Sequence, residues 1–178
     1  MEESAFIELQ RECFNIVSAI LKAQIPLKHN LEISTINDTV LADLAAYGRT
    51  GYFVGHVDFL MSTQSTAGVG LPLRLVTYYN KRPLGYLSGS YDDGKFFVYH
   101  WELSNDADEE LHKNWLRIIT SALEYLAVCF EKYTEENHKV SCIAFTSPSE
   151  TDRRAFSEAE FSYNPDIYKG IPAYYINR

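Results

Sequence analysis

Two side chains that could handle a proton lie near the end of an aromatic segment, FFVYHWEL (Phe96–Leu103). His100 and Glu102 alternate in this segment, so both would point to the same face of a β-strand. An imidazole and a carboxylate on one face are typical of general-base chemistry, here the removal of a proton from an amine. Each also has a structural interpretation: Glu102 as a solvated acid at a helix start, and His100 as a half-buried residue with a backbone partner.

The elements that must position this pair follow from the spacing of apolar residues. An acidic joint, Ser104–Glu110, follows the aromatic segment, and apolar residues then recur at steps of three and four from Leu111 to Tyr133. This pattern predicts a long amphipathic helix. Three residues of the joint could cap it: Asn105, Asp106 and Asp108. Val140–Ser147 is typical of a buried strand, and a strand, a helix and a strand in this order join parallel strands by a right-handed crossover.

The rest of the chain predicts helices at residues 3–24, 39–47 and 150–159, and strands at 31–35, 73–79, 84–90, 160–163 and 171–177. The strands 73–79, 84–90 and 96–103 would form an antiparallel meander. Residues 50–60 fit either a strand or a helix followed by a loop, and 62–70 are typical of an exposed loop. Asn80–Pro83 and Asn164-Pro165-Asp166 predict turns, and Ser149 with Asp152 predicts a helix cap.

Length and composition indicate one folded domain over residues 1–178. Hydrophobic residues make up 46% of the chain, yet no apolar run approaches the roughly 18 residues of a membrane span. The acidic start, MEESAFIELQ, is unlike a secretory signal, so a cytoplasmic location is expected. Three cysteines without paired spacing fit reduced thiols, and none stands near a His or Cys at zinc spacing, so no metal site is expected.

The formal net charge of −8 restricts the partners. Nucleic-acid backbones and anionic membranes would be repelled. A basic protein partner or an amine substrate fits this charge better. The oligomeric state stays open.

Three local features resemble the GNAT superfamily of acyl-CoA N-acyltransferases: KRPLGYLSG, the aromatic strand that leads into a long helix, and TSPSETDRRAFSEAEFSY, which is similar to the family's N..A..lYek.GF. The resemblance covers roughly Leu73 to Arg178, which implies a core at 73–178 that resembles the family and a divergent N-terminal helical part at 1–60. It implies an α/β fold with a GNAT-like mixed, splayed central sheet, an antiparallel meander and a long crossover helix, to which this chain adds an N-terminal helix. The parallel strands Phe96–Leu103 and Val140–Ser147 would part, with the donor's pantetheine entering between them and an amine meeting it from the other side.

The resemblance implies acyl-CoA as co-substrate, with no tightly bound cofactor. It places the donor's phosphates at Leu103, Ser104 and Asn105, and Ser149 falls on the family's Asn. The sequence departs from the family here, because the joint has no glycine and holds five carboxylates: Glu102, Asp106, Asp108, Glu109 and Glu110. Like charges at about 4 Å repel by about 1 kcal/mol even in water. The family's Gly falls on Glu160 and its general-acid Tyr on Phe156, which has no proton to donate.

Two functions stay open. One is an N-acyltransferase that moves an acyl group from a thioester donor to an amine, possibly on a protein, with His100 and Glu102 as the catalytic pair. The other is a catalytically inactive GNAT-fold module, such as an inhibitor, immunity or accessory protein, that binds a protein through its acidic surface. A fainter similarity to toxin-activating lysine acyltransferases places His29 near their His and Tyr99 at their catalytic Asp, but an acidic chain would repel their acidic carrier protein.

Overall fold

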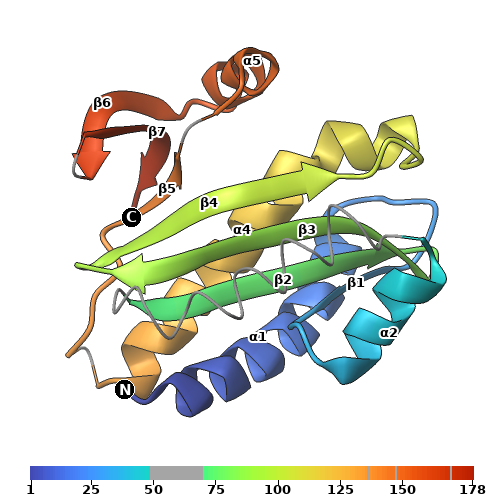
Figure 1. Cartoon of the computed structure of the whole chain (residues 1–178), viewed down its shortest axis with the longest axis horizontal. Coiled ribbons are helices and arrows are strands. Elements are labelled where there is room, and N and C mark those ends of the chain that lie inside the picture. The colour runs from blue at the N-terminus through green and yellow to red at the C-terminus, as the bar shows by residue number, and fades with distance from the viewer. Residues whose placement is uncertain (49–69, 136, 147, 169) are drawn as a thin grey trace.

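The computed structural model describes residues 1–48, 70–135, 137–146, 148–168 and 170–178 (Figure 1). The helices are α1 (Glu3–Gln24), α2 (Asp38–Ala46), α4 (Glu109–Tyr133) and α5 (Glu150–Glu158). The strands are β1 (Leu31–Ser34), β2 (Leu71–Tyr79), β3 (Arg82–Asp92), β4 (Lys95–Leu103), β5 (Cys142–Thr146), β6 (Ser162–Tyr168) and β7 (Ile171–Asn177). This order confirms the predicted one.

The described strands form one sheet in the order β1-β2-β3-β4-β5-β7-β6. Only β4 and β5 are parallel neighbours, and every other adjacent pair is antiparallel. The meander is β2, β3 and β4, and α4 makes the long crossover from β4 to β5. The predicted fold class is therefore confirmed, including the added N-terminal helix.

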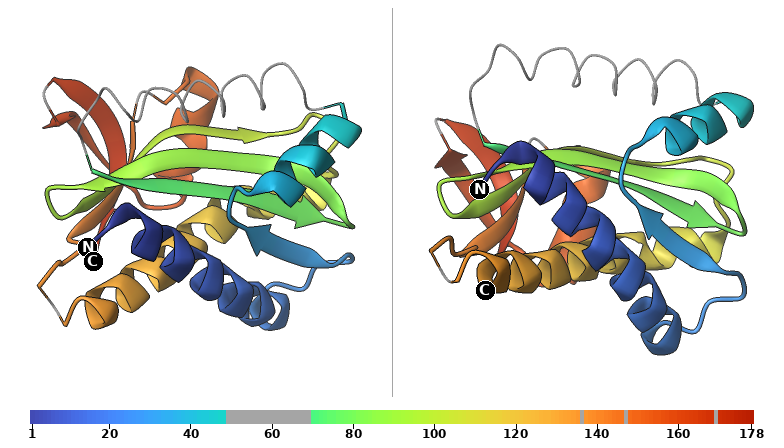
Figure 2. Two further views of the ribbon diagram at one scale, coloured as in Figure 1. Left: turned by 60° about the horizontal axis from the view of Figure 1, so that its bottom comes forward. Right: turned by 90° about the horizontal axis from the view of Figure 1, so that it is seen from below.

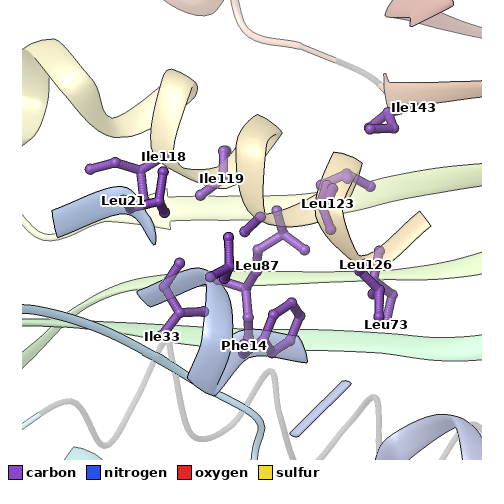
Figure 3. Close-up of a cluster of buried hydrophobic side chains, with 14 of the residues drawn as sticks. Phe14, Leu21, Ile33, Leu73, Leu87, Ile118, Ile119, Leu123, Leu126 and Ile143 are labelled. Carbon is purple, nitrogen blue, oxygen red and sulfur yellow. The ribbon is translucent and has the colours of Figure 1, made fainter. Parts of the chain in front are cut away.

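Two helices cover one face of the sheet, α1 and α4, while α2 lies on the other face (Figure 2). Figure 3 shows the side chains of α1, α4 and the sheet that meet in the main core, including Phe14, Leu87 and Leu123. A smaller cluster joins α2 to the opposite face through Leu44, Val76 and other residues. The amphipathic stripe of α4 is thus buried as its spacing predicts.

Local side-chain bonds fix where the helices begin and how they meet the strands. Asp108 is the N-cap of α4, and its carboxylate accepts a hydrogen bond from the Leu111 amide at 2.9 Å. On α1 the Ser18 hydroxyl accepts a hydrogen bond from the Ile33 amide at 2.8 Å, which ties that helix to β1. Of the three caps that the sequence offers for α4, Asp108 is the one used.

One glycine sets the distance between the sheet and α4. A Cβ atom at Gly85 of β3 would lie 2.3 Å from the indole ring of Trp115 on α4. Trp115 is buried, and its indole nitrogen has no hydrogen-bond partner among the described residues. Any larger residue at position 85 would push the first turns of α4 away from the sheet.

Two predicted turns differ in the structure. The turn expected at Asn80–Pro83 is shorter, because β3 already begins at Arg82, and the two turn residues Asn80 and Lys81 have φ of 52° and 62°. Because both residues are in the left-handed region, they form a two-residue hairpin loop whose twist matches that of the flanking strands. Asn164-Pro165-Asp166 was expected as a turn but lies within β6, where the pairing with β7 shifts register. The predictions for residues 50–60 and 62–69 lie outside the described residues.

The described helices were also compared with the length and hydropathy that a bilayer requires. In the described part of the chain, none is both long and apolar enough to span a membrane.

Candidate active site

The parallel strands β4 and β5 part after four paired residues. Lys95–Val98 of β4 pairs with Cys142–Phe145 of β5, whereas β4 continues to Leu103 with β3 as its only neighbour among the described strands. A hydrogen bond of 3.1 Å from the Thr146 hydroxyl to the Val98 carbonyl closes the point where they separate. The predicted splay is therefore present, and we call the space between Tyr99–Leu103 and the end of β5 the splay.

A β-bulge at Tyr99 lies where the splay begins. Ser88 of β3 pairs with His100 and Gly89 with Val98, so Tyr99 is the extra residue on β4. A Cβ atom at Gly89 would lie 1.9 Å from the Phe97 carbonyl oxygen, so the bulge requires a glycine on β3. The sequence did not indicate this bulge.

The bulge leaves His100 and Glu102 on the face of the sheet opposite α4. The His100 ring lies 6.0 Å from that of Tyr86, which packs in the smaller core under α2. The imidazole Nε2 is 3.6 Å from a Glu102 carboxylate oxygen, and the two side chains are 18% and 32% exposed. The structure thus brings the predicted pair together on one face, within reach of one water molecule.

Burial controls the protonation of this pair. Desolvation lowers the pKa of His100 below its ordinary value of about 6.5, even with the Glu102 carboxylate nearby. The imidazole is therefore neutral at pH 7. A neutral imidazole beside a carboxylate is a suitable arrangement for accepting a proton.

In the turn between β4 and α4, backbone amides donate hydrogen bonds to oxygen atoms of the same turn. The Asp106 amide donates to the Ser104 hydroxyl at 3.3 Å, and the Ala107 amide to the Ser104 carbonyl at 3.0 Å. The Leu111 amide is taken by Asp108. These backbone N–H groups lie where the resemblance places a pyrophosphate, but each already donates to an oxygen atom of the chain.

The residues predicted to hold the donor's phosphates differ in exposure. Leu103 packs against the main core and Ser104 is 3% exposed, whereas Asn105 is exposed. Ser149 is the N-cap of α5 in a reciprocal capping box with Asp152, which confirms the predicted cap. Ser104 and Ser149 therefore have structural hydrogen bonds, and of the four residues Asn105 and Ser149 are exposed to solvent.

Three carboxylates of the acidic joint have partners that the sequence did not suggest. Asp106 pairs with Arg82 of β3 at 3.1 Å, and Glu109 pairs with Lys113 one turn along α4 at 2.7 Å. Glu110 accepts hydrogen bonds from the Tyr79 hydroxyl and from the Lys28 amide, and these bonds lower the pKa of its carboxyl. The joint is thus less repulsive to an anion than its composition implies.

An aromatic cluster fills the splay on the side of α4 and α5. Its members are Trp101 of β4, Phe145 of β5, Phe156 of α5, Phe161 after α5, and Tyr174 of β7. The Trp101 ring lies 5.3 Å from Phe145 and 5.8 Å from Phe156, both edge-on, and Phe156 stacks on Tyr174 at 5.2 Å. We call this cluster the aromatic plug. It occupies the space where the resemblance places the pantetheine arm, so the residues present do not fit a donor held in the family's usual way.

A cleft of about 520 Å³ lies outside the aromatic plug, between α4 and α5. Lys113, Arg117, Thr120 and Glu158 line it together with Phe161, a member of the plug. The Thr120 hydroxyl is buried without a hydrogen-bond partner among the described residues. Phe161 contacts both Phe145 and Phe156 at 5.8 and 5.1 Å, so the plug stands between this cleft and the face that carries His100 and Glu102.

The two residues of the fainter similarity, His29 and Tyr99, contact different strands. His29 packs edge-on against Tyr79 of β2 at 5.4 Å, whereas Tyr99 of β4 shares a hydrogen bond of 2.8 Å with the Ser90 hydroxyl. Among the described residues, no group of three or more His, Cys, Asp or Glu side chains could hold a metal ion.

Comparison with known proteins gives a likeness of structure only. No protein-family model matches the sequence, and no curated protein matches it either. An acetyltransferase from Thermus thermophilus is similar in structure, with a TM-score of 0.54 and 12% identity, over 83% of this chain and 97% of that one. A PaiA N-acetyltransferase from Thermoplasma acidophilum, solved with coenzyme A, gives 0.51 and 12%, over 83% and 99%.

A third solved structure is the Salmonella typhimurium acetyltransferase that modifies the N-terminal serine of ribosomal protein L7/L12. It gives a TM-score of 0.52 and 11% identity, over 83% of this chain and 95% of that one. At 11–12% identity these likenesses show a shared fold. The chain has the fold of the GNAT N-acetyltransferases.

Proposed function

We propose that this protein is an N-acyltransferase that moves an acyl group from a thioester donor of the acyl-CoA type to an amine. The observation that carries the proposal is the position of His100 and Glu102, on the stretch of β4 that has parted from β5. A donor arm between these strands would bring its thioester beside a carboxylate. The likeness to acetyltransferases, one of them bound to coenzyme A, supports the same donor class.

The proposed reaction needs one proton acceptor from the protein. The amine nitrogen attacks the thioester carbonyl carbon, a C–N bond forms, and the C–S bond breaks to give an amide and a thiol. Glu102 takes the amine proton, directly or through water, with neutral His100 beside it. Phe156 stands at the position of the family's acid Tyr, so the leaving sulfur takes its proton from solvent.

The acceptor is an amine, and the charge of the chain favours a cationic one. A formal net charge of −8 attracts an ammonium group and lowers the local concentration of anions. An amine on a basic protein fits this field, and a structurally similar enzyme acts on the N-terminal serine of a ribosomal protein. A small polyamine fits the same charge, so both belong in the acceptor screen.

The test is release of free thiol from acetyl-CoA and longer acyl-CoAs, with polyamines and basic proteins as acceptors. Glu102→Gln should lower turnover by about 10²- to 10⁴-fold, the usual range for loss of a general base. Glu32→Gln is the matched control, because Glu32 is an exposed glutamate on β1, away from the splay. Equal turnover in wild type and Glu102→Gln would remove Glu102 from the mechanism.

A second candidate is the inactive protein-binding module. The observations that favour it are the aromatic plug and the internally bonded amides before α4, both of which oppose a nucleotide donor. Thermal denaturation separates the two functions. A ligand at 100 times its dissociation constant stabilises a protein by about 2.7 kcal/mol, and no stabilisation by any acyl-CoA would favour the module.

A further inference from the structure

We propose that the indole of Trp101 is a gate that determines whether a thioester arm can enter the splay. The inference rests on the proposed function and deepens it, because it names the residue that selects the donor. The acyltransferase would then be closed in the conformation described above and open when this one side chain turns away.

The position of Trp101 supports the gate. It lies three residues beyond Val98, the last residue of β4 that pairs with β5. Its ring nevertheless reaches across to Phe145 of β5 and to Phe156 of α5, with centroid distances of 5.3 and 5.8 Å. One side chain therefore spans the gap that the backbone leaves.

The contacts and partial burial of Trp101 allow its ring to move. Its ring is only partly buried and meets both neighbours edge-on, at 90° and 84°. No hydrogen bond to a described residue holds the indole nitrogen. Phe145 and Phe156, by contrast, are fully buried at 0% and 1% exposure. Of these three rings, Trp101 is the one that can turn without opening the core.

The walls behind the gate indicate what would enter. With the indole turned away, Phe145, Phe156 and Tyr174 would line the space, and the cleft at Phe161 would lead into it. Such a wall suits a slender arm with few charges, such as pantetheine with its acyl group. The acidic joint lies outside this space, so an arm without phosphates avoids it.

The experiment measures binding of pantetheine and of coenzyme A by calorimetry. Trp101→Ala should bind pantetheine at least tenfold more tightly than wild type does. Trp101→Phe, which keeps a ring in the splay, should stay within about threefold of wild type. Tyr163→Ala is the matched control, since Tyr163 contacts Tyr174 of the same cluster from an exposed position and its removal should leave binding unchanged.

The outcomes separate the gate from the proposed function. If wild type and Trp101→Ala bind pantetheine and coenzyme A equally well, the gate is wrong while an acyl-CoA donor stands. If neither protein binds either ligand, the donor assignment fails and the gate with it. Should Trp101→Ala not fold cooperatively, Trp101→Leu keeps an apolar side chain at this position and is expected to show the same gain over wild type; equal affinity there also overturns the gate.

Discussion

The buried imidazole of His100 makes stability depend on pH. Its pKa is lower in the folded protein than the ordinary value of about 6.5, so the folded state binds fewer protons than the unfolded chain. The contribution of the buried, neutral His100 to the free energy of unfolding is fully present above that ordinary value, and it is lost as the pH falls toward the folded pKa. We expect melting temperatures of wild type to fall more steeply below pH 6.5 than those of His100→Gln.

The control for this pH dependence is His112→Gln, because His112 is an exposed histidine on α4. It should follow the wild-type curve. If His100→Gln follows that curve too, burial of His100 does not contribute to the acid sensitivity.

Glu160 has a backbone conformation that suits another residue. It follows α5 with φ of 62°, in the left-handed region, and the family's glycine falls on this position. Such a conformation costs a side-chain-bearing residue about 1 kcal/mol or more. Glu160→Gly should therefore stabilise the protein by about 0.5–1 kcal/mol in urea unfolding. Ser157→Gly, inside the exposed last turn of α5, should destabilise it, because glycine there only adds chain entropy.

At the level of single residues, the alternation of side chains along a strand predicted correctly which of them share a face. Contacts between distant parts of the chain could not be predicted. His100 and Glu102 share a face as predicted, because the bulge at Tyr99 comes before both of them. The contacts of Trp101 were not foreseen, since Phe145 and Phe156 lie more than forty residues further along the chain. Only the folded splay brings these rings together.

At the level of elements, β3 and β4 depend on one glycine. Because a Cβ atom at Gly89 would lie 1.9 Å from the Phe97 carbonyl oxygen, Gly89→Ala must separate the two strands or remove the bulge. We expect a loss of about 1–3 kcal/mol in urea unfolding, the range of an overpacked interior. Gly48→Ala is an informative contrast: its Cβ atom would meet no atom of the described residues within 4 Å, and the unfavourable feature there is its φ of 68°, so it should cost less.

One ion pair joins the ends of three elements. Glu131 of α4 accepts hydrogen bonds from Arg178, after β7, and from the Val140 amide, before β5, both at 2.9 Å. Burial alone would raise the pKa of Glu131, but these bonds lower it on balance. The stabilisation is therefore present above the ordinary pKa of a glutamate and is lost as the pH falls through the lowered one.

Arg178→Ala should cost about 1–2 kcal/mol at pH 7, as for a charge-assisted hydrogen bond with limited exposure, and less at pH 3. Arg154→Ala is the comparison, because its pair with Glu158 on α5 has a similar length, 2.7 Å against 2.9 Å, but its side chains are 86% and 65% exposed. Solvent screening weakens an exposed pair of this kind, so Arg154→Ala should cost less than Arg178→Ala. Equal costs for the two variants would contradict the role given to Glu131.

The periodicity of the sequence predicted the helices and the central strands, but it failed at β6. The prediction treated Asn164-Pro165-Asp166 as a turn because these residue types favour turns. They lie instead in a strand at the edge of the sheet, where proline loses no ladder hydrogen bond and a shift of register is tolerated. Residue type alone does not distinguish an edge strand from a loop.

On the scale of the whole molecule, the order of elements was enough to predict the fold. A meander followed by a helix and a strand leaves few arrangements once the crossover must be right-handed. The function was less predictable, because it depends on how local groups are used. The amides before α4 and the rings in the splay oppose the family's usual donor contacts, while the His100–Glu102 pair favours the family's chemistry, and one fold accommodates both.

The two tryptophans of the chain occupy very different surroundings. Trp101 is partly exposed in the aromatic plug, whereas Trp115 is held against Gly85 under the sheet. Trp115→Phe would remove an indole nitrogen that has no partner among the described residues and leave Trp101 as the sole indole fluorophore. The emission of that variant would then shift to longer wavelength whenever the ring moves into water, which gives the protein an optical signal of its own for watching a donor arrive.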